Sequence, residues 1–217
     1  AKDEADFFVR LDRMMDIAAR SLKIKRTTVE KLLEEGLYPY TKRYLGGFDN
    51  HFSTIGINGM NECCLNFLGV SIATEEGSAF SRKVMTFMRE VMAEFQEETG
   101  NIYNLEATPA ESTAYRFARI DTQRYPDIIT ANQQARTERG AKPYYTNSTH
   151  LPVGYSDDIY EVLAKQDPLQ TLYTGGTVLH IFTGEHEMSP ESAKRLVRKV
   201  TGGFRLPYIT ISPSFSV

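Results

Sequence analysis

The sequence has 217 residues, of which 41% are hydrophobic and 24% are charged, with a formal net charge of −3 at pH 7. This composition is ordinary for a globular domain with a substantial core, gives no electrostatic footprint for DNA or RNA, and contains no run near the ~20 apolar residues of a membrane span. No signal-peptide pattern is present, and the adjacent Cys63 and Cys64 are unsuited to a mutual disulfide, so a reducing, cytoplasmic location is expected.

Two helices are expected in the first part of the chain. Apolar residues recur at three- and four-residue spacing from Phe7 to Leu22, which predicts an amphipathic helix. A capping-box pattern at 27–30 then predicts a second helix start, and Gly36 is its expected stop.

Strands and helices are expected to alternate over the rest of the chain. The expected strands cover residues 52–57, 102–107, 178–182 and 206–211, with a further extended stretch at 143–146. The expected helices cover 61–67, 78–99 and 156–165, and further helices start at Pro109 and Ser189. This alternation predicts an α/β domain with mostly parallel strands.

The segment LEATPAEST joins an expected strand to the next helix. Thr108 as N-cap, Pro109 at the first helical position and Glu111 at the third form a capping box, which by itself explains a well-started helix. Helix N-termini also attract phosphate, and Ser112 and Thr113 add hydroxyls to the first turn, whereas Glu111 adds a negative charge. Spacing alone leaves both interpretations open, and the pattern is neither a Walker loop nor a Rossmann fingerprint.

Two further segments are polar enough to line a site. The glycines of Thr174-Gly175-Gly176-Thr177 allow close backbone approach to a ligand, although paired glycines before a strand are also ordinary turn residues. The stretch from Tyr144 to His150 is rich in hydroxyl and amide groups. It forms either one wall of a polar site or a hydrogen-bonded loop.

Metal and nucleophile patterns are weak. His180 and His186 flank Glu185, but the histidines lack the spacing of metal ligands, so no metal site is expected in this segment. Cys63 and Cys64 lie near an expected helix start, where a thiol either packs as a small apolar group or acts as a nucleophile favoured by the helix N-terminus.

Four stretches taken together resemble the anaerobic (class III) ribonucleoside-triphosphate reductases, the glycyl-radical branch of the ribonucleotide reductases. They are RYLGGFDNHFSTIGINGMNE, LEATPAESTAYRFARIDTQRYPDI, YYTNSTHLPV and YTGGTVLHIFTGE, and the likeness runs from about Gly36 to Val217 in the family's order. It implies part of a ten-stranded α/β barrel made of two antiparallel halves around a finger loop. Residues 1–217 are then a partial catalytic barrel, and the allosteric region, finger-loop cysteine, zinc site and glycyl-radical loop lie outside it. The first residue, Ala1, and the apolar last run also lead us to expect a longer protein.

The resemblance implies the anaerobic reduction of ribonucleoside triphosphates to deoxyribonucleoside triphosphates. A glycyl radical, installed by a separate activase that carries S-adenosylmethionine and an iron–sulfur cluster, passes the radical to the finger-loop cysteine, which abstracts the 3′ hydrogen of the ribose. A structural zinc and an electron donor, formate or a redoxin, are implied as well. The implied partners are the substrate, ATP and dNTP effectors, the activase and a second copy in a homodimer. This segment alone is not expected to turn over substrate.

The resemblance also assigns residues to the site. The substrate phosphates are expected at Thr108, Pro109, Ala110, Glu111, Ser112 and Thr113. The expected active-site lining is Asn58, Asn147, Ser148, His150, Gly175, Gly176 and Thr177. Cys63 and Cys64 are not expected to be the radical cysteine, which lies upstream in the family. Two alternatives are a pyruvate formate-lyase-like enzyme, which predicts no triphosphate binding, and a non-catalytic α/β nucleotide-binding module, which predicts that the 217 residues fold and bind alone.

Overall fold

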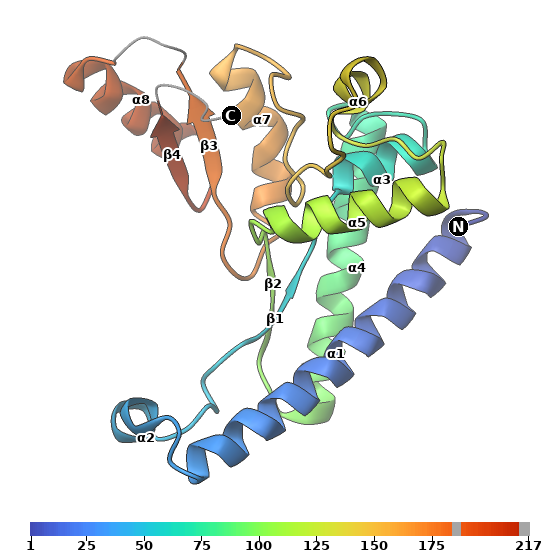
Figure 1. Cartoon of the computed structure of the whole chain (residues 1–217). Helices are drawn as coiled ribbons and strands as arrows, with labels where there is room; N and C mark the ends of the chain where they lie inside the picture. The colour runs from blue at the N-terminus through green and yellow to red at the C-terminus, as the bar shows by residue number, and fades with distance from the viewer. Residues whose placement is uncertain (184–187, 213–217) are drawn as a thin grey trace. The chain divides into compact units, whose positions relative to one another are not determined.

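Helices and short strands follow one another in a computed structural model of the chain, which describes residues 1–183 and 188–212 (Figure 1). The helices are α1 (Glu4–Glu34), α2 (Pro39–Leu45), α3 (Met60–Phe67), α4 (Glu75–Thr99), α5 (Glu111–Arg124), α6 (Gln133–Arg139), α7 (Ile159–Gln170) and α8 (Pro190–Gly203). The strands are β1 (Ser53–Gly56), β2 (Tyr103–Glu106), β3 (Leu179–Phe182) and β4 (Ile209–Ser212). The expected mixture of helices and strands is confirmed. Two short helices, α2 and α6, were not expected from the sequence.

The chain divides into two compact units. The first unit contains residues 1–55 and 86–105, and the second contains residues 56–85 and 106–217. In the first unit, Phe8 of α1 lies edge to face against Phe87 of α4, with ring centroids 5.1 Å apart. Arg26 of α1 donates hydrogen bonds to the backbone carbonyls of Phe48 and His51, which ties the segment before β1 to this helix.

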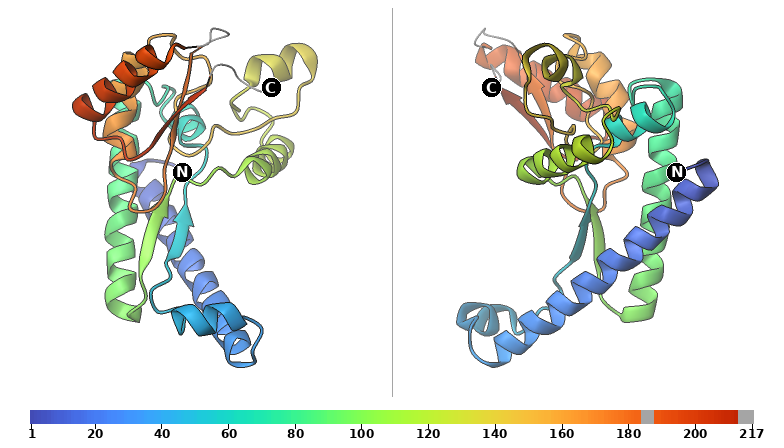
Figure 2. Two further views of the ribbon diagram at one scale, coloured as in Figure 1. Left: turned by 90° about the vertical axis from the view of Figure 1, so that its left-hand side faces the viewer. Right: turned by 45° about the vertical axis from the view of Figure 1, so that its right-hand side comes forward.

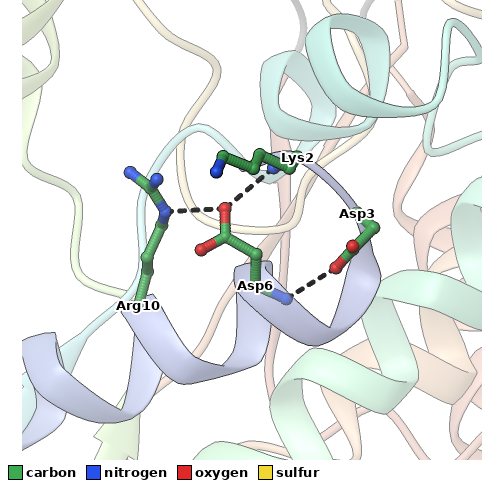
Figure 3. Close-up of polar contacts among 4 residues, drawn as sticks. All are labelled: Lys2, Asp3, Asp6 and Arg10. Carbon is green, nitrogen blue, oxygen red and sulfur yellow. Dashed lines mark hydrogen bonds and ion pairs between the residues drawn. The ribbon is translucent and has the colours of Figure 1, made fainter.

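The start of α1 is fixed by acidic side chains. The Asp3 carboxylate accepts a hydrogen bond from the Asp6 amide at 2.8 Å, the contact of an N-cap residue (Figure 3). The Asp6 carboxylate in turn accepts from Arg10 Nε at 3.0 Å and from the Lys2 amide at 2.8 Å. The Arg10 hydrogen bond, assisted by the Lys2 amide, holds the pKa of Asp6 below its ordinary value. The negative charges of these carboxylates are stabilised by the positive end of the helix dipole.

The second helix start expected at 27–30 is wrong, because α1 runs without a break for 31 residues. The Thr28 hydroxyl donates back to the Ile24 carbonyl of the preceding turn at 2.9 Å and does not cap a new N-terminus. The expected stop is confirmed, since Gly36 follows the helix with a φ of 88°.

The strands pair in two separate sheets. β1 and β2 are neighbours in one two-stranded sheet and lie side by side in both views of Figure 2. The Ser53 amide donates to the Ile102 carbonyl and the Ile57 amide to the Glu106 carbonyl, so both strands advance in the same direction. β3 and β4 pair in parallel, with Leu179 opposite Ile209. Parallel pairing is therefore confirmed, whereas a ten-stranded barrel is not visible within the described residues.

The parallel pair β3–β4 has its own apolar core in the second unit. β3 contributes Leu179 and Ile181, and the helices that pack on it contribute Leu163 of α7 with Leu196 and Val200 of α8. The start of α8 is as expected from the sequence, since the Ser189 hydroxyl accepts from the Ser192 amide at 3.2 Å and Pro190 is the first helical residue. Among the described helices, none is both long and apolar enough to cross a membrane.

The capping box expected at Thr108 is wrong. α5 begins at Glu111, its N-cap is Ala110, and no side chain among the described residues caps it. Residues 107–110 instead follow β2 as irregular backbone, and Pro109 is not the first helical residue. The Ala107 amide donates to the Gly176 carbonyl at 2.9 Å, which extends the chain past β2 before the helix can start.

Candidate functional site

A cavity of about 510 Å³ lies in the second unit, where β1 turns into α3 and β2 leads into α5. The first turn and α3 contribute Gly56, Ile57, Asn58, Gly59, Glu62, Cys63 and Asn66. The second turn and α5 contribute Thr108, Ala110, Thr113 and Phe117, and Ile128 and Tyr145 complete the lining. Two strand-to-helix turns that are distant in sequence thus share one cavity, at the strand ends where α/β folds bind ligands.

Glycines allow the segments around the cavity to come this close. A Cβ atom on Gly56 would lie 3.0 Å from the Thr108 hydroxyl oxygen, so a larger residue would push the two turns apart. Gly59 has a φ of 74°, and a Cβ atom there would lie 3.2 Å from Cβ of Tyr145. A side chain at either position would require Thr108 or Tyr145 to shift by a few tenths of an ångström.

The N-terminus of α5 lies at this cavity, and no side chain in the described part of the chain caps it. The first amides of a helix have no acceptor within the helix, and the helix dipole gives them a partial positive charge. Ala110 has no side chain that could accept from them, and Thr113 brings a hydroxyl to the cavity from the first turn. Glu111 and Ser112 are exposed and do not line the cavity, and neither does Pro109. The Glu111 carboxylate is therefore not part of the cavity wall.

The N-terminus of α3, by contrast, is already occupied by protein groups. The Gly59 and Met60 amides donate to the carbonyls of Thr146 and Ser148 at 2.9 and 3.0 Å. Of the two helix starts at the cavity, the start of α5 is therefore the one suited to an anion.

Glu62 of α3 is a buried carboxylate, 2% exposed, that holds the loop around Thr146. Its Oε2 accepts from the Thr146 amide at 2.7 Å, and its Oε1 accepts from the Thr146 hydroxyl at 2.7 Å and from Asn61 Nδ2 at 2.9 Å. All three contacts come from donors, which matches an ionised carboxylate with two acceptor oxygens. This network fixes the loop that presents Tyr145 to the cavity.

Tyr145 is a neutral, fixed wall of the cavity. Its hydroxyl donates to Asp121 Oδ2 of α5 at 2.7 Å. Burial, and after it the hydrogen bond to Asp121, raises the pKa of Tyr145 well above its ordinary value, so the phenol stays protonated at physiological pH. The bond links α5 to the loop that Glu62 holds.

Asn58 has an unusual environment in the cavity lining. Its Nδ2 and Oδ1 atoms are both buried, and neither has a hydrogen-bond partner among the residues that the structure describes. Leaving a buried polar group unpaired costs about 1–3 kcal/mol. An amide with both ends unpaired is therefore a feature that packing alone does not explain.

The two cysteines have different environments. Cys63 lines the cavity, and burial, together with the neighbouring Cys64 and Glu62, raises its pKa to about 12. Cys64 is completely buried, with Sγ 3.6 Å from the Gly77 carbonyl oxygen and 3.5 Å from the Ser81 hydroxyl, and burial raises its pKa too. Both are thiols at neutral pH, and thiols are poor nucleophiles compared with thiolates.

The remaining residues expected at the active site are not part of the cavity lining. They are Asn147, Ser148, His150, Gly175, Gly176 and Thr177. Gly176 lies against the Glu106 side chain at the end of β2, and its carbonyl accepts from the Ala107 amide. These residues belong to loops that border the cavity's turns.

A buried polar network joins these loops. The Thr177 hydroxyl donates to Gln170, whose amide donates to Gln166 Oε1 at 2.8 Å. The Gln166 amide donates to the Thr149 carbonyl at 3.1 Å, and the Thr149 and Tyr173 hydroxyls are 2.9 Å apart. The two glutamines are completely buried, so the loops at 147–150 and 174–177 are held by a common set of hydrogen bonds.

His150 lies between two backbone carbonyls. Its Nδ1 is 3.0 Å from the Asn147 oxygen and its Nε2 is 2.8 Å from the Val178 oxygen. A neutral imidazole donates from one nitrogen only, so both contacts are satisfied only in the protonated ring. Burial is nevertheless the dominant influence and lowers the pKa of His150 below its ordinary value, although both carbonyls raise it.

This lowered pKa predicts a pH-dependent stability. Because unfolded His150 takes up a proton more readily than folded His150, the stability it contributes is present above the ordinary pKa of about 6.5 and is lost as the pH falls towards the folded pKa. We expect His150→Gln to remove part of this acid destabilisation, up to about 1.4 kcal/mol per pH unit. Urea unfolding between pH 7.5 and 5.5 measures it, with the exposed His51→Gln as control. If the free energy of unfolding fell equally with pH in the wild type and in His150→Gln, the expectation would be contradicted.

Metal ligands are not clustered in the described part of the chain, where no group of three or more His, Cys, Asp or Glu side chains is placed to hold a metal ion. Glu185 and His186, which follow His180 in the sequence, lie outside the described residues. The His180 ring instead hydrogen-bonds the Thr210 hydroxyl of β4 at 2.6 Å.

Solved structures with the same fold are anaerobic ribonucleotide reductases. The enzyme from Thermotoga maritima with dATP bound in the specificity site matches with a TM-score of 0.78 and 20% identity, over 97% of this chain and 34% of that chain. The same enzyme with citrate in the active site matches with a TM-score of 0.76 and 20% identity, over 96% and 37%. The fold of this chain thus matches about a third of these reductase structures.

Sequence comparison gives the family. The sequence model of anaerobic ribonucleoside-triphosphate reductase matches residues 1–217, and the chain belongs to this family. The reductase of enterobacteria phage T4 is 27% identical over 163 residues, which are 74% of this chain and 25% of the relative. The Escherichia coli K12 reductase is 26% identical over 211 residues, or 89% and 28%. The chain spans about a quarter of the length of these relatives.

Proposed function

We propose that this chain supplies the substrate-phosphate site of an enzyme that reduces ribonucleoside triphosphates to deoxyribonucleoside triphosphates without oxygen. The observation that carries the proposal is the uncapped N-terminus of α5 at the cavity, in a chain that belongs to the anaerobic reductase family. Residues 1–217 are then one part of a ten-stranded catalytic α/β barrel.

The turn from Thr108 to Thr113 holds the phosphates in this proposal. The first amides of α5 donate to phosphate oxygens, and the Thr108 and Thr113 hydroxyls add donors from the cavity wall. Ser112 is exposed next to Thr113 and reaches a phosphate at the cavity's mouth. Pro109, Ala110 and Glu111 shape the turn, and Glu111 is exposed.

The loops with Asn147, Ser148, His150, Gly175, Gly176 and Thr177 border the active site in this proposal. Their buried hydrogen bonds hold the turns in place, as the Ala107–Gly176 contact does at the end of β2. Such a frame keeps the phosphate donors in fixed directions, which lowers the cost of binding.

The radical machinery is assigned to other parts of the complete protein. The glycyl radical supplies the one-electron chemistry that ribose reduction needs, and with the finger-loop cysteine and the structural zinc it lies outside this chain. Formate or a redoxin provides the electrons, and an activase with S-adenosylmethionine and an iron–sulfur cluster installs the radical. The T. maritima structures contain dATP in the specificity site, and dATP with CTP. ATP and dNTP effectors, a homodimer and a cytoplasmic location complete the proposal.

The alternatives make different predictions. A pyruvate formate-lyase-like enzyme would bind a small organic substrate and no triphosphate, and a non-catalytic nucleotide-binding module would bind as an isolated chain. The match of the whole chain to the triphosphate-reductase family favours the reductase over both.

The double substitution Ser112→Ala with Thr113→Ala tests the phosphate site in the complete protein. Each hydrogen bond to a charged group is worth roughly 1.5–3 kcal/mol, so the dissociation constant of a ribonucleoside triphosphate should rise at least about tenfold. The control is Thr122→Ala on the same helix, whose hydroxyl donates to the Arg119 carbonyl and which is not part of the cavity lining. Equilibrium binding gives the dissociation constant of the triphosphate for the double variant and for the control. An unchanged dissociation constant in the double variant would refute the assignment.

A further inference from the structure

Helix α5, whose first turn holds the phosphates in the proposed function, is weakly held by apolar packing. Of its 14 residues, only Ala114 and Ala118 are buried. An alanine side chain is a single methyl group, so these two residues bury little apolar surface. The larger Phe117 side chain is 48% exposed and lines the cavity. The direction of α5 is therefore fixed mainly by other contacts.

A single side-chain hydrogen bond joins α5 to another segment within the described ranges, 1–183 and 188–212. The Tyr145 hydroxyl donates to Asp121 Oδ2 at 2.7 Å, a length typical of a hydrogen bond to an ionised carboxylate. Lys142, which is exposed, also lies 5.9 Å from the centre of the Tyr115 ring. A cation–π contact at an exposed site is weak, so the Tyr145–Asp121 bond is the stronger tie.

The Tyr145 end of this bond is held in place by the rest of the unit. The next residue, Thr146, donates from its amide and its hydroxyl to the buried Glu62 carboxylate, both at 2.7 Å. Tyr145 also lies against Gly59, where a Cβ atom would be 3.2 Å from Cβ of Tyr145. Burial raises the pKa of Tyr145, so its hydroxyl remains a donor at physiological pH. Asp121 is therefore bound to a fixed donor.

Asp121 is distant from the end of α5 that meets the cavity. It follows Glu111, the first helical residue, by ten residues, or about 15 Å at 1.5 Å per residue. The chain before the helix is held by the bond from the Ala107 amide to the Gly176 carbonyl. With both points held, the helix has one direction. Without the bond at Asp121 the helix can tilt about its first turn, and hydrogen bonds from its first amides weaken as they depart from linearity.

We propose that the hydrogen bond from Tyr145 to Asp121 orients the first turn of α5 toward the substrate phosphates, which makes Asp121 a positioning residue for triphosphate binding. Asp121 is not part of the cavity lining, so it acts through the helix and not by contact with the ligand. The inference rests on the proposed function, since it takes the phosphates to lie at the turn from Thr108 to Thr113. The negative charge of Asp121 by itself repels a triphosphate, so a charge effect and a positioning role predict opposite results.

The test uses the complete protein and follows occupancy of the cavity through Cys63, which lines it. Protection of Cys63 from N-ethylmaleimide gives the dissociation constants of a ribonucleoside triphosphate and of the unphosphorylated nucleoside with the same base. Asp121→Ala and Tyr145→Phe remove the bond, whereas Asp121→Asn keeps an acceptor oxygen for the Tyr145 hydroxyl. The matched control is Tyr155→Phe, which removes a hydroxyl that donates to the exposed Glu161 at 3.1 Å.

The expected result is a selective loss of triphosphate binding. In Asp121→Ala and in Tyr145→Phe, the dissociation constant of the triphosphate rises about fivefold or more, and that of the nucleoside changes less than about twofold. The two substitutions combined have the effect of either alone, because both remove the same bond. Asp121→Asn and Tyr155→Phe stay within about twofold of the wild type. Should Asp121→Ala fail to fold, the comparison of Tyr145→Phe with Asp121→Asn decides.

Three results would overturn the inference. Tighter triphosphate binding in Asp121→Ala and Asp121→Asn would show that the carboxylate acts through its charge. Unchanged dissociation constants with a lower free energy of unfolding, or equal weakening of triphosphate and nucleoside, would show that the bond is structural only. The proposed function stands in each case if Ser112→Ala with Thr113→Ala still weakens triphosphate binding. If no ribonucleoside triphosphate protects Cys63 in the wild type, the inference and the proposed function fail together.

Discussion

Glu62→Gln is expected to lower the free energy of unfolding of the second unit by about 3 kcal/mol or more, although the substitution keeps the shape of the side chain. Both carboxylate oxygens accept hydrogen bonds, from the Thr146 amide, the Thr146 hydroxyl and Asn61 Nδ2. Gln has one acceptor oxygen, so its amide nitrogen would face a donor whichever way the side chain turned. Charge-assisted bonds would be lost and a buried donor left unpaired.

Two measurements check this expectation in the complete protein. Urea unfolding gives the stability, and hydrogen exchange of peptides covering 144–150 should become faster, because the Thr146 amide loses its acceptor. The matched control is Glu161→Gln, an exposed carboxylate that accepts from the Ser156 and Tyr155 hydroxyls, and its change should stay below about 0.5 kcal/mol. Similar losses for both substitutions would show that the buried network does not hold the loop.

Gly77→Ala is expected to destabilise the same unit by about 3 kcal/mol or more. A Cβ atom on Gly77 would lie 2.2 Å from the Ser71 carbonyl oxygen and 3.0 Å from Cα of Ile72. These are backbone atoms, and the Ser71 carbonyl also accepts from the Thr74 hydroxyl at 2.8 Å, so the segment cannot move without losing contacts. The overlap outweighs the gain of about 1 kcal/mol that Ala normally brings to a helix.

Gly202→Ala is the matched control for this substitution. Gly202 is also helical, in α8, and among the described residues no atom outside its own stretch of helix lies within 4 Å of the position that its Cβ atom would take. This substitution should raise the midpoint of urea unfolding, by about 0.5–1 kcal/mol in stability. If Gly77→Ala stabilised the protein as Gly202→Ala should, the close approach of Ser71 to α4 would be contradicted.

Local patterns predicted most elements but misjudged two helix starts. The Ser189-Pro190 start of α8 holds because the Ser189 hydroxyl meets a free amide of the first turn. The same kind of pattern failed at 27–30, where Thr28 bonds back to Ile24 inside a continuous helix. It failed again at Thr108, because a contact from Ala107 to Gly176, distant in sequence, keeps the chain extended. A capping residue thus starts a helix only where tertiary contacts allow it.

The site was predictable only in part for a similar reason. The turn after β2 stands out in the sequence, and Thr108, Ala110 and Thr113 do line the cavity. The roles of Glu62 and Tyr145 depend on contacts with residues far along the chain, such as the bond from Glu62 to Thr146, 84 residues away. Composition and spacing carry no signal for such pairs. Nor could spacing show that the Asn58 side chain lacks a hydrogen-bond partner among the described residues while Asn66 has several.

The central claim, that this chain carries the substrate-phosphate site of a ribonucleoside-triphosphate reductase, is tested most directly by product analysis. The complete protein, activated without oxygen and supplied with an electron donor, should convert a ribonucleoside triphosphate to the deoxyribonucleoside triphosphate. Ser112→Ala with Thr113→Ala should lower kcat/KM at least about tenfold while the glycyl-radical signal in electron paramagnetic resonance is unchanged. A full radical signal with no deoxyribonucleotide formed by the wild type, or with unchanged kcat/KM in the double variant, would contradict the account.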